Sequence, residues 1–509
     1  MTNPIQTYLN TIQTNLNTGQ AKEHTHRAAL ELLIETLAPK VNAVNEPTRI
    51  ACGSPDFVVL QKKGNVPVGY IEAKDIGISL DKTLKTEQLK RYLPALNNLI
   101  LTDYLSFRWF VEAEERKELK ITLATVDKNN KLIANETDFE LFKQLIEQFV
   151  STFVVTLNNP DDLAQRMASI AQLINSVVLK AYENEDKDGV LHGQLDGFRQ
   201  VLIDGLQPEQ FADMYAQTVC YGLFAARCHI SVDKIFIRET AAHCLPKTNP
   251  FLRKLFNEIA GTDLDDRLVW AVENLTEVLR RADIAAILKD FGKRTKQEDP
   301  VVHFYETFLK HYNPKLRETR GVYYTPEPVV SYIVRSVDLV LKQQFKLKDG
   351  LADNSMLDIN GEQRHRVQIL DPATGTGTFL YAVVDKIYEK FSRIKGMWSD
   401  YVHTHLLPRL HGFELLIAPY TVAHMKLGLS LQEKGYDFAS AERLRIFLTN
   451  SLENVFEKGD TPSLPFAQWL LNEGKAASEI KQDIPVMVIV GNPPYSGHSV
   501  NKGEWISDL

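Results

Sequence analysis

The chain is poor in cysteine, has no long apolar run and carries no excess of positive charge. Its 509 residues include four cysteines. No two of them form a C-x-x-C pair, which argues against a disulfide scaffold and a zinc ribbon. No apolar run approaches the roughly 18 residues of a membrane span, and the first residues show no signal-peptide pattern. We therefore expect a soluble protein of a reducing compartment, with no membrane partner.

The net charge of the chain is −7, from 58 basic and 65 acidic residues. Binding to nucleic acid would therefore have to come from local basic patches, not from the charge of the whole chain. Hydrophobic residues make up 44% of the sequence and charged residues 24%, which is ordinary globular composition. A chain of this length predicts about three domains.

Three zones of different patterning follow one another along the chain. Residues 1–155 mix an amphipathic helix, predicted over 23–39, with short strand-like runs. Residues 156–300 are almost wholly helical in pattern and end in a polar stretch that suits a linker. Residues 301–509 alternate strands, a glycine loop and helices, so we expect a multidomain α/β protein with an all-α connector in its middle. The strand-like runs of the first zone are 56–60, 66–72 and 104–111.

A glycine loop follows the apolar strand predicted over 366–370. It reads Asp371-Pro-Ala-Thr-Gly-Thr-Gly-Thr-Phe379, and apolar residues at helical spacing come after it. Strand, G-x-G turn and helix bring backbone N–H groups and a helix N-terminus against a ligand. The loop lacks the third glycine of a dinucleotide site and the Gly-Lys-Ser/Thr of a phosphate-binding loop, so a phosphate cradle is disfavoured. By itself the pattern also suits a turn that merely needs small residues.

A second motif follows the apolar strand predicted over 486–490. It reads Gly491-Asn492-Pro493-Pro494-Tyr495. Two consecutive prolines donate no hydrogen bonds, which leaves the carbonyl groups of this turn free to accept. Asn492 adds a side-chain acceptor and Tyr495 adds a ring. Acceptors beside an aromatic face suit a flat base that carries an exocyclic amine.

Together the two motifs resemble those of S-adenosylmethionine-dependent methyltransferases that act on adenine N6 in DNA. The resemblance covers about residues 300–509, includes the segment Thr319-Arg-Gly-Val-Tyr-Tyr-Thr-Pro-Glu327, and implies a Rossmann-like domain. It also implies cofactor-binding roles for Tyr324, Thr325, Pro326, Asp371, Thr374, Gly375, Gly377, Phe379, Glu414 and Asn450.

The implied roles within this set differ. The first three residues would line the cofactor pocket, and the glycine loop would hold the methionine end above Phe379. Glu414 would accept the ribose hydroxyls, although a surface carboxylate is the alternative, and Asn450 would be a weaker contact to the adenine ring. Asn492 and the Pro493 carbonyl would hold the hydrogens of the target amine. The flipped base would stack on Tyr495.

A pair of carboxylates stands out near the start of the chain. Residues 55–74 predict a β-hairpin with its turn near Gly64, which sets Asp56 opposite Glu72. Period-two alternation puts Glu72 and Lys74 on one face. Two opposed carboxylates with an ammonium group suit Mg²⁺ as a bound metal ion and phosphodiester hydrolysis as a reaction. The alternative is an ordinary exposed hairpin with a salt bridge.

Gln88 and Tyr92 follow one helical turn apart and resemble the accessory Q-x-x-x-Y element of some PD-(D/E)xK nucleases. We therefore expect a PD-(D/E)xK nuclease domain over 1–155, with Asp56 and Glu72 as metal ligands and Lys74 and Gln88 as further catalytic residues. A third carboxylate would come from the preceding helix, where the candidates are Glu23, Glu31 and Glu35.

Nuclease, helical connector (156–300) and adenine methyltransferase (301–509), in that order, resemble the type IIG restriction–modification enzymes. No G-x-x-x-x-G-K-[ST] lies in the middle, so ATP-driven translocation is not predicted. The resemblance implies that the protein methylates adenine in double-stranded DNA and cleaves unmodified DNA with Mg²⁺, in the cytoplasm of a bacterium or archaeon. A modification-only enzyme and a non-catalytic DNA-associated subunit are the alternatives. Because the chain ends shortly after Tyr495, we expect that a partner or a missing C-terminal segment carries target recognition.

Overall fold

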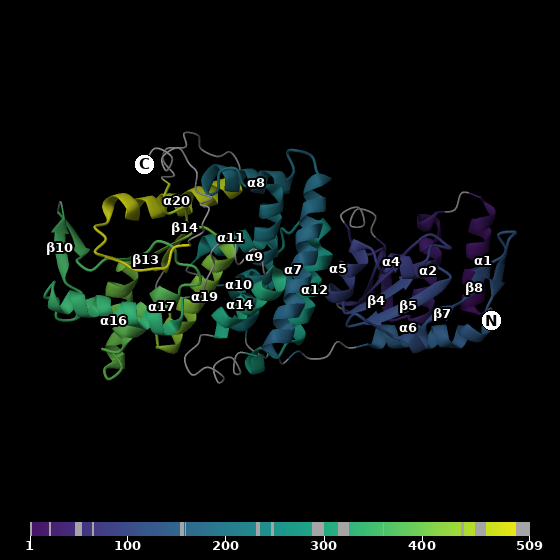
Figure 1. Cartoon of the computed structure of the whole chain (residues 1–509), viewed down its shortest axis with the longest axis horizontal. Coiled ribbons are helices and arrows are strands. Elements are labelled where there is room, and N and C mark those ends of the chain that lie inside the picture. The colour runs from purple at the N-terminus through teal and green to yellow at the C-terminus, as the bar shows by residue number, and fades with distance from the viewer. Residues whose placement is uncertain are drawn as a thin grey trace. The chain divides into compact units, whose positions relative to one another are not determined.

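The computed structural model of the protein divides into two compact units (Figure 1). Unit 1 consists of Met1–Asn158, Gln165–Asn184 and Asp265–Asp283, and unit 2 of Asn159–Ala164, Glu185–Leu264 and Ile284–Leu509. The structure describes residues 3–19, 22–45, 53–63, 66–152, 157, 159–230, 235–245, 249–287, 300–313, 325–359, 361–438, 442–453 and 465–494.

Unit 1 is built on a seven-stranded sheet in the order β1-β2-β3-β4-β5-β6, with β7 paired to β5. Neighbouring strands are antiparallel, except that β3 and β4 are parallel and are therefore joined by a helical crossover, α4 and α5. The strands are β1 (Val41–Val44), β2 (Phe57–Gln61), β3 (Pro67–Ala73), β4 (Asn98–Thr102), β5 (Ser106–Val111), β6 (Glu114–Glu115) and β7 (Ile121–Thr122). A separate hairpin contains β8 (Ala124–Val126) and β9 (Leu132–Ala134).

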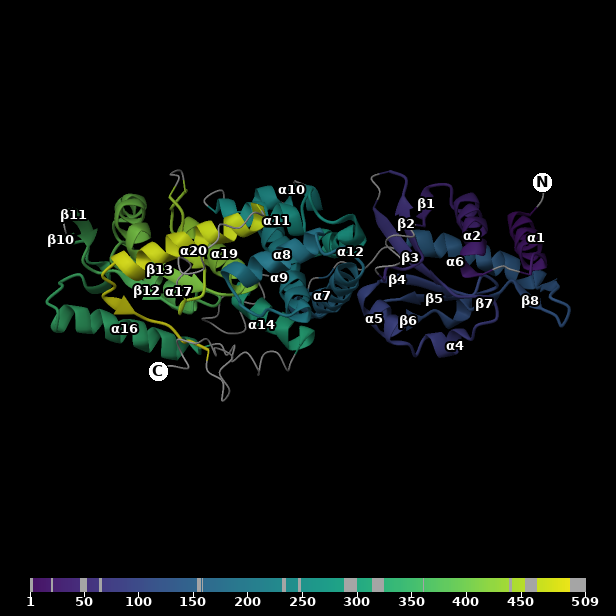
Figure 2. The same cartoon turned by 90° about the horizontal axis from the view of Figure 1, so that it is seen from above.

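Helices cover both faces of this sheet, as Figure 2 shows for α2 and α4. One face packs its alternate apolar residues, such as Phe57 and Ile71, into a core with α1, α2 and α6. Glu72 is the neighbour of Ile71 on β3, so it points to the other face. The helices of unit 1 are α1 (Pro4–Asn17), α2 (Glu23–Leu37), α4 (Leu80–Thr83), α5 (Glu87–Ala95), α6 (Phe139–Ser151), α7 (Pro160–Glu183) and α12 (Asp266–Arg281).

The predicted hairpin of unit 1 is present as β2 and β3. Its register pairs Phe57 with Ile71, and one more step in the same register sets Asp56 opposite Glu72, as predicted. The register shifts between Val59 and Leu60, so the hairpin is not symmetric about its turn. The predicted turn residue Gly64 lies outside the described residues. The strand predicted to begin at 104 begins at Ser106, because Tyr104 has φ of +70°, which no strand residue adopts.

Unit 2 is built on a parallel sheet in the order β14-β13-β12-β15. The strands are β12 (Ile369–Asp371), β13 (Leu410–Glu414), β14 (Arg445–Leu448) and β15 (Val488–Ile489). The connecting helices α17 (Thr378–Tyr388) and α19 (Ile417–Glu433) contact each other, while α20 (Pro465–Asp483) packs on Leu370, Phe413 and Phe447. β13 and β14 follow β12 on one side of the sheet, whereas β15 is added on the other side, so the strand order reverses beside β12. Open parallel sheets bind ligands at such a point, outside the carboxyl ends of the strands.

The predicted strands of unit 2 are shorter than their apolar runs. The runs over 366–370 and 486–490 contain β12 and β15, which cover only 369–371 and 488–489. Pairing is irregular at their beginning because the Gln368 carbonyl accepts from the N–H groups of both Met487 and Val488. A two-stranded hairpin of β10 (Met356–Ile359) and β11 (Glu362–His365) completes the strands of the described residues.

The region predicted to be helical is confirmed, because the described residues between 159 and 287 contain helices and no strand. By their contacts, α12 and the part of α7 from Gln165 onward belong to unit 1, whereas the start of α7 and the helices between α7 and α12 belong to unit 2. The predicted domain boundaries at 155 and 300 stay predictions, and the linker over 292–300 lies largely outside the described residues. The remaining helices of unit 2 are α8 (Val190–Val201), α9 (Pro208–His229), α10 (Arg238–Cys244), α11 (Pro250–Ile259), α14 (Pro300–Tyr312), α16 (Glu327–Gln343) and α18 (Trp398–Tyr401).

The expected mixed α/β, multidomain class is therefore confirmed. None of the helices in the described part of the chain combines the length and the apolar character that a membrane crossing requires.

Candidate functional site

Four strand ends meet at the carboxyl edge of the unit 2 sheet. Asp371 ends β12, Glu414 ends β13, Asn450 follows β14 and Asn492 follows β15. Because parallel strands point the same way, loops that are far apart in the sequence meet at one edge. The predicted cofactor residues and the predicted methyl-transfer residue thus come from neighbouring loops.

Asp371 is buried with one oxygen left unpaired. Its Oδ1 accepts a hydrogen bond of 3.1 Å from the N–H of Ala373, whereas Oδ2 has no hydrogen-bond partner among the residues that the structure describes. Burial raises the pKa of Asp371 to about 7, against the effect of the Ala373 N–H group. A buried carboxylate with an orphaned oxygen costs free energy unless a donor or a cation approaches it. The site is therefore suited to a positively charged or hydrogen-bond-donating ligand.

The glycine loop runs close to β13 and keeps open space above it. Thr374 fixes the loop by donating its N–H to the Phe413 carbonyl at 2.9 Å. Gly375 and Gly377 have φ of +54° and +81°, in the left-handed region that favours glycine. In the described part of the chain, a Cβ at Gly375 would meet nothing within 4 Å, whereas one at Gly377 would lie 3.2 Å from the Cβ of Ala423. The space above Gly375 can therefore take a ligand in contact with the backbone.

Glu414 holds the glycine loop and its own turn. Its Oε2 accepts from the N–H of Gly375 at 2.8 Å, and its Oε1 accepts from the N–H groups of Leu415 and Leu416, both at 2.8 Å. Burial raises the pKa of Glu414, and these N–H groups oppose the rise. The alternative of an unattached surface carboxylate is therefore wrong. Oε2 accepts one hydrogen bond and keeps a further lone pair, so acceptance from a ribose hydroxyl stays a prediction.

The loop after β14 is held by a lysine that the sequence patterns did not single out. Lys481 of α20 donates to the Asn450 carbonyl at 2.6 Å, to Thr449 Oγ1 at 3.2 Å and to the Glu453 carbonyl at 2.9 Å. Ser451 Oγ donates to the Pro372 carbonyl, which ties this loop to the glycine loop. A lysine near the end of an amphipathic helix normally indicates a solvated side chain, so no sequence signal predicted this role.

The loop after β15 lies against the glycine loop. A Cβ at Gly491 would lie 2.5 Å from Asp371 Oδ1, so only glycine allows this approach. Asn492 donates from Nδ2 to Thr325 Oγ1 at 2.9 Å, which joins the segment before α16 to the loop. Thr325, Asp371 and Asn492 are therefore brought together. Phe379 is buried beneath the loop, Pro326 and Pro493 are exposed, and Tyr324 and Tyr495 lie outside the described residues.

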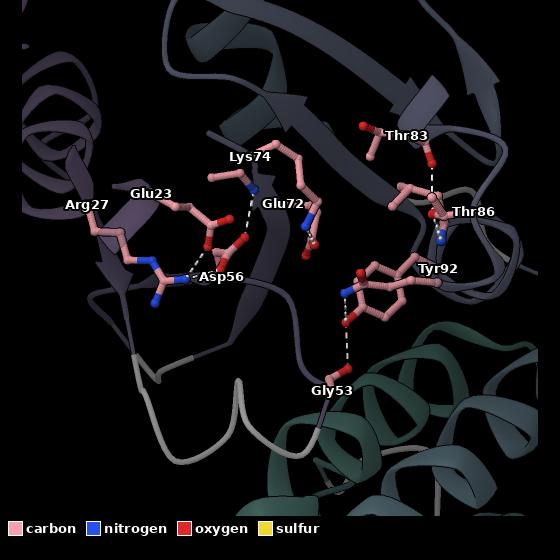
Figure 3. A network of polar contacts seen from close by, with 12 residues as sticks. Glu23, Arg27, Gly53, Asp56, Glu72, Lys74, Thr83, Thr86 and Tyr92 are labelled. Atoms are coloured by element: carbon pink, nitrogen blue, oxygen red, sulfur yellow. Dashed lines mark hydrogen bonds and ion pairs between the residues drawn. The ribbon is translucent and has the colours of Figure 1, made fainter. Parts of the chain in front are cut away.

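The carboxylate pair of unit 1 is buried as well (Figure 3). Glu72 Oε1 accepts from the Lys74 ammonium, whereas Oε2 is buried and has no hydrogen-bond partner within the described residues. Asp56 Oδ2 accepts from the N–H of Ala73 at 2.7 Å, and Oδ1 accepts from the Arg27 guanidinium. The alternative of an ordinary exposed hairpin is therefore wrong, because both carboxylates are shielded from water.

Burial governs the electrostatics of this cluster. It raises the pKa of Glu72 to about 7, and the charge of Asp56 adds to the rise while Lys74 opposes it. Burial also raises the pKa of Asp56, against the N–H group of Ala73 and the charges of Arg27 and Lys74. Burial lowers the pKa of Lys74, but the charge and hydrogen bond of Glu72 outweigh it, so that pKa is raised. The two carboxylates are thus held close together at a cost that a bound cation would relieve.

Gln88 and Tyr92 act on the loop before β2. Gln88 Nε2 donates to the Tyr92 hydroxyl at 3.1 Å. That hydroxyl donates to the Gly53 carbonyl at 2.5 Å, as Figure 3 shows for Tyr92 and Gly53. The pKa of Tyr92 is raised by burial and then by the charge of Glu72, which places the ring in the same neighbourhood. The pair therefore supports the segment that leads into Asp56. A direct catalytic role for Gln88 stays a prediction.

Among the three candidates for a third carboxylate, Glu23 lies beside the pair. Its Oε1 accepts from Arg27 at 2.7 Å, and Arg27 in turn contacts Asp56. Glu35 instead accepts from the N–H of Ala43, and burial followed by the charge of Glu35 raises the pKa of Glu31. Within the described ranges, no three His, Cys, Asp or Glu side chains group closely enough to hold a metal ion. Arg27, which the sequence patterns did not single out, stands between Glu23 and Asp56.

Comparison with known proteins gives a family match for one part of unit 2. Residues 296–508 match the family model for N-6 DNA methylases, so this part of the chain contains an N-6 DNA methylase domain. Methylases of this family use S-adenosylmethionine as methyl donor. A Methanocaldococcus jannaschii protein named as a type II restriction enzyme and methyltransferase is 22% identical over 230 residues, which are 39% of this chain and 19% of that protein.

Two solved structures are also similar. The cryo-electron microscopy structure of the DrdV–DNA complex matches 98% of this chain and 44% of that chain, with 20% identity and a TM-score of 0.41. A nuclease-deletion mutant of the type ISP restriction–modification enzyme LlaGI, in complex with a DNA substrate mimic, matches 72% of this chain and 26% of that one, with 21% identity and a TM-score of 0.44. The chain thus spans less than half the length of these relatives.

Gly375→Ala tests whether a ligand occupies the space above the glycine loop. The free protein has room for the methyl group, so the only cost without ligand is about 1–2 kcal/mol for the left-handed backbone. We expect S-adenosylmethionine affinity to fall about tenfold or more, measured by calorimetry, because the methyl group would take the space of the ligand. Gly361→Ala is the matched control, since Gly361 has φ of +88° and equal room in the β10–β11 turn. Equal, unchanged affinity in both variants would place the ligand elsewhere.

Lys481→Met tests whether the loop after β14 must be held for cofactor binding. The variant removes three donated hydrogen bonds, each typically worth about 0.5–1.5 kcal/mol. We therefore expect S-adenosylmethionine affinity to fall about tenfold in calorimetry. Lys475→Met, at an exposed position on the same helix, is the control and should bind as the unchanged protein does.

The same lysine predicts a pH dependence. Burial lowers the pKa of Lys481 from 10.5 to about 8, so its ammonium loses a proton as the pH rises through 8. The neutral amine has one donor fewer, and cofactor affinity should fall between pH 7 and 9. Lys481→Arg keeps its charge over this range and should flatten the profile. An unflattened profile would assign the pH dependence to another group.

Proposed function

We propose that the protein is a restriction–modification enzyme of the type IIG kind. In this proposal unit 2 is a Rossmann-like methyltransferase that acts on adenine N6 in double-stranded DNA. The carboxylate cluster of unit 1 belongs to a PD-(D/E)xK nuclease that cleaves unmodified DNA with Mg²⁺. The observation that carries the proposal is the meeting of Thr325, Asp371 and Asn492 at one edge of the parallel sheet, inside the region that matches N-6 DNA methylases.

The residues at this edge fit S-adenosylmethionine. When bound, it supplies a methyl group on a positively charged sulfur. Asp371 Oδ2 offers an unpaired buried carboxylate oxygen to the ammonium group of the methionine part. That contact would return the raised pKa of Asp371 towards its ordinary value and so favour binding of the cation. Gly375 gives the ligand room at the backbone, and Glu414 lies at the neighbouring strand end for the ribose.

Asn492 and the Pro493 carbonyl prepare the target amine. The amine of adenine is a poor nucleophile because its lone pair is conjugated with the ring. Asn492 Nδ2 donates a hydrogen bond to Thr325 Oγ1, and this contact orients Asn492 Oδ1 as the acceptor for one hydrogen of the target amine. The Pro493 carbonyl accepts the other amine hydrogen. Acceptors fixed in advance stabilise the positive charge that develops on nitrogen as the methyl group is transferred. A base within a duplex is out of reach, so it must flip out, and Tyr495 is the proposed stacking partner.

The cluster of unit 1 fits Mg²⁺ in part. Mg²⁺ is usually held by one or two carboxylates together with water and phosphate oxygens. Glu72 Oε2 is an unpaired buried oxygen that suits this role, whereas both oxygens of Asp56 already accept hydrogen bonds. Lys74 would stabilise the negative charge that builds up on the attacked phosphate. The engagement of Asp56 by Arg27 favours a second candidate function, a modification-only enzyme in which this cluster has no metal ion.

Asn492→Ala tests the methyl-transfer site. It removes a preorganised acceptor and leaves the glycine loop unchanged, so we expect the rate to fall about 10²–10³-fold with S-adenosylmethionine affinity retained. The measurement is tritiated-methyl transfer to mixed-sequence duplex DNA, followed by nucleoside analysis. Asn472→Ala, at an exposed position on α20, is the control. Undiminished N6-methyladenine formation by Asn492→Ala would refute the assignment.

Asp56→Asn and Lys74→Met test the nuclease assignment. Both variants should abolish Mg²⁺-dependent cutting of unmodified DNA, whereas methyl transfer should persist because its residues lie in unit 2. Lys90→Met is the control, because Lys90 forms an exposed ion pair with Glu87 on α5. Absence of Mg²⁺-dependent cutting in the unchanged protein, with methyl transfer present, would instead support the modification-only enzyme.

A further inference from the structure

Arg27 is a buried cation at the centre of the unit 1 cluster, and none of the nuclease motifs includes it. It projects from α2 with only 4% of its side chain exposed. One terminal nitrogen, Nη2, contacts both Glu23 Oε1, at 2.7 Å, and Asp56 Oδ1. The other, Nη1, is 3.4 Å from Asn45 Oδ1. Figure 3 shows the contacts from the guanidinium to both carboxylates as dashed lines.

The cluster is close to neutral but not satisfied. Three carboxylates, those of Glu23, Asp56 and Glu72, face two cations, Arg27 and Lys74. Two of the polar atoms, Glu72 Oε2 and Arg27 Nε, are buried and find no hydrogen-bond partner in the described ranges. Buried groups of this kind carry a desolvation penalty of about 1–3 kcal/mol each, and more when charged. The observed arrangement therefore leaves an anionic oxygen that one more cation would satisfy.

The two oxygens of Asp56 differ in how firmly they are held. Oδ2 accepts from the backbone N–H of Ala73, within β3, and giving it up would leave a buried backbone donor unpaired. Oδ1 accepts only from the Arg27 side chain, which rotatable bonds can move. Glu23 lies one turn away on the same helix and would keep hold of Arg27 after such a movement. Oδ1 is therefore the oxygen of Asp56 that can be exchanged.

We propose that Arg27 and a divalent cation compete for Asp56 Oδ1, so that Arg27 sets the metal affinity of the cluster. Without metal, the positive charge of the guanidinium balances the negative charge of the buried Asp56 carboxylate. With metal bound, Asp56 Oδ1 and Glu72 Oε2 face the ion, and Arg27 remains with Glu23. The proposal rests on the nuclease function proposed above, and it makes Arg27 a positioning residue that tunes metal occupancy.

Arg27→Met in the full chain tests the competition. The variant removes the guanidinium and keeps the aliphatic stem, so a divalent ion no longer has to displace a charge. We expect calorimetry with Mg²⁺ and with Mn²⁺ to show a Kd about tenfold lower or more, because a charge-assisted contact no longer has to be broken. The metal-free melting temperature should fall, and saturating metal should raise it by more than in the unchanged protein.

Arg108→Met is the matched control. Arg108 is also buried in unit 1, with 8% of its side chain exposed, and it pairs with Asp81 and Glu115. The Arg108→Met variant should lower the melting temperature without changing the metal Kd. Arg27→Lys is the second variant, and it should keep a metal Kd close to that of the unchanged protein because the competing charge is retained.

The outcomes separate this proposal from the nuclease assignment. If folded Arg27→Met binds metal with an unchanged or higher Kd, the proposed competition is wrong. If Asp56→Asn loses metal binding in the same experiments, the nuclease assignment is still supported. If the unchanged protein binds neither Mg²⁺ nor Mn²⁺, both proposals fail. Circular dichroism establishes that each variant is folded. If Arg27→Met does not fold, Arg27→Gln takes its place: it also removes the charge, so its metal Kd should be lower, and an unchanged or higher Kd would overturn the competition.

Discussion

Burial of carboxylates is the constraint on which both candidate sites depend. In unit 1 and in unit 2 the chain takes acidic side chains out of water, at Glu72 and at Asp371, and one oxygen of each has no partner among the described residues. Such an arrangement lowers stability unless something else supplies the missing interaction. The pKa of each of these groups is raised to about 7, which is the electrostatic expression of the same cost. Sites that bind cations or donors are built in this way.

The surrounding structure holds these carboxylates in place through contacts from other elements. In unit 2, Gly491 permits the loop after β15 to lie against Asp371, and Glu414 secures the glycine loop through Gly375. In unit 1, the backbone of β3 holds one oxygen of Asp56, and Arg27 of α2 holds the other. Asp56 is thus fixed by one backbone contact, which cannot move, and by the Arg27 side chain, which can. That division separates the rigid part of the unit 1 site from the part that a ligand can exchange.

Several strands and the opposition of the unit 1 carboxylates could be predicted from the sequence. Apolar runs before the glycine loop and before Gly491 predicted β12 and β15, and their lengths were overestimated because pairing at Gln368 is irregular. The spacing of Asp56 and Glu72 predicted their opposition across a hairpin, and the register confirms it. Local periodicity succeeds in such cases because it depends only on the backbone geometry of the element itself. The strand β4 was missed, although its five residues are all buried.

The sequence by itself determined which residue types are present, the alternation that forms the strands and the motif order that indicates an N-6 DNA methylase domain. Only the tertiary structure decided that Glu23 lies beside Asp56 and that Glu31 and Glu35 do not, because all three lie on one helix and its rotation against the sheet selects among them. The tertiary structure also brought Arg27 and Lys481 to their sites. A long charged side chain on a helix has the same sequence pattern whether it is solvated or folded back onto a loop, since the choice depends on acceptors supplied by distant segments.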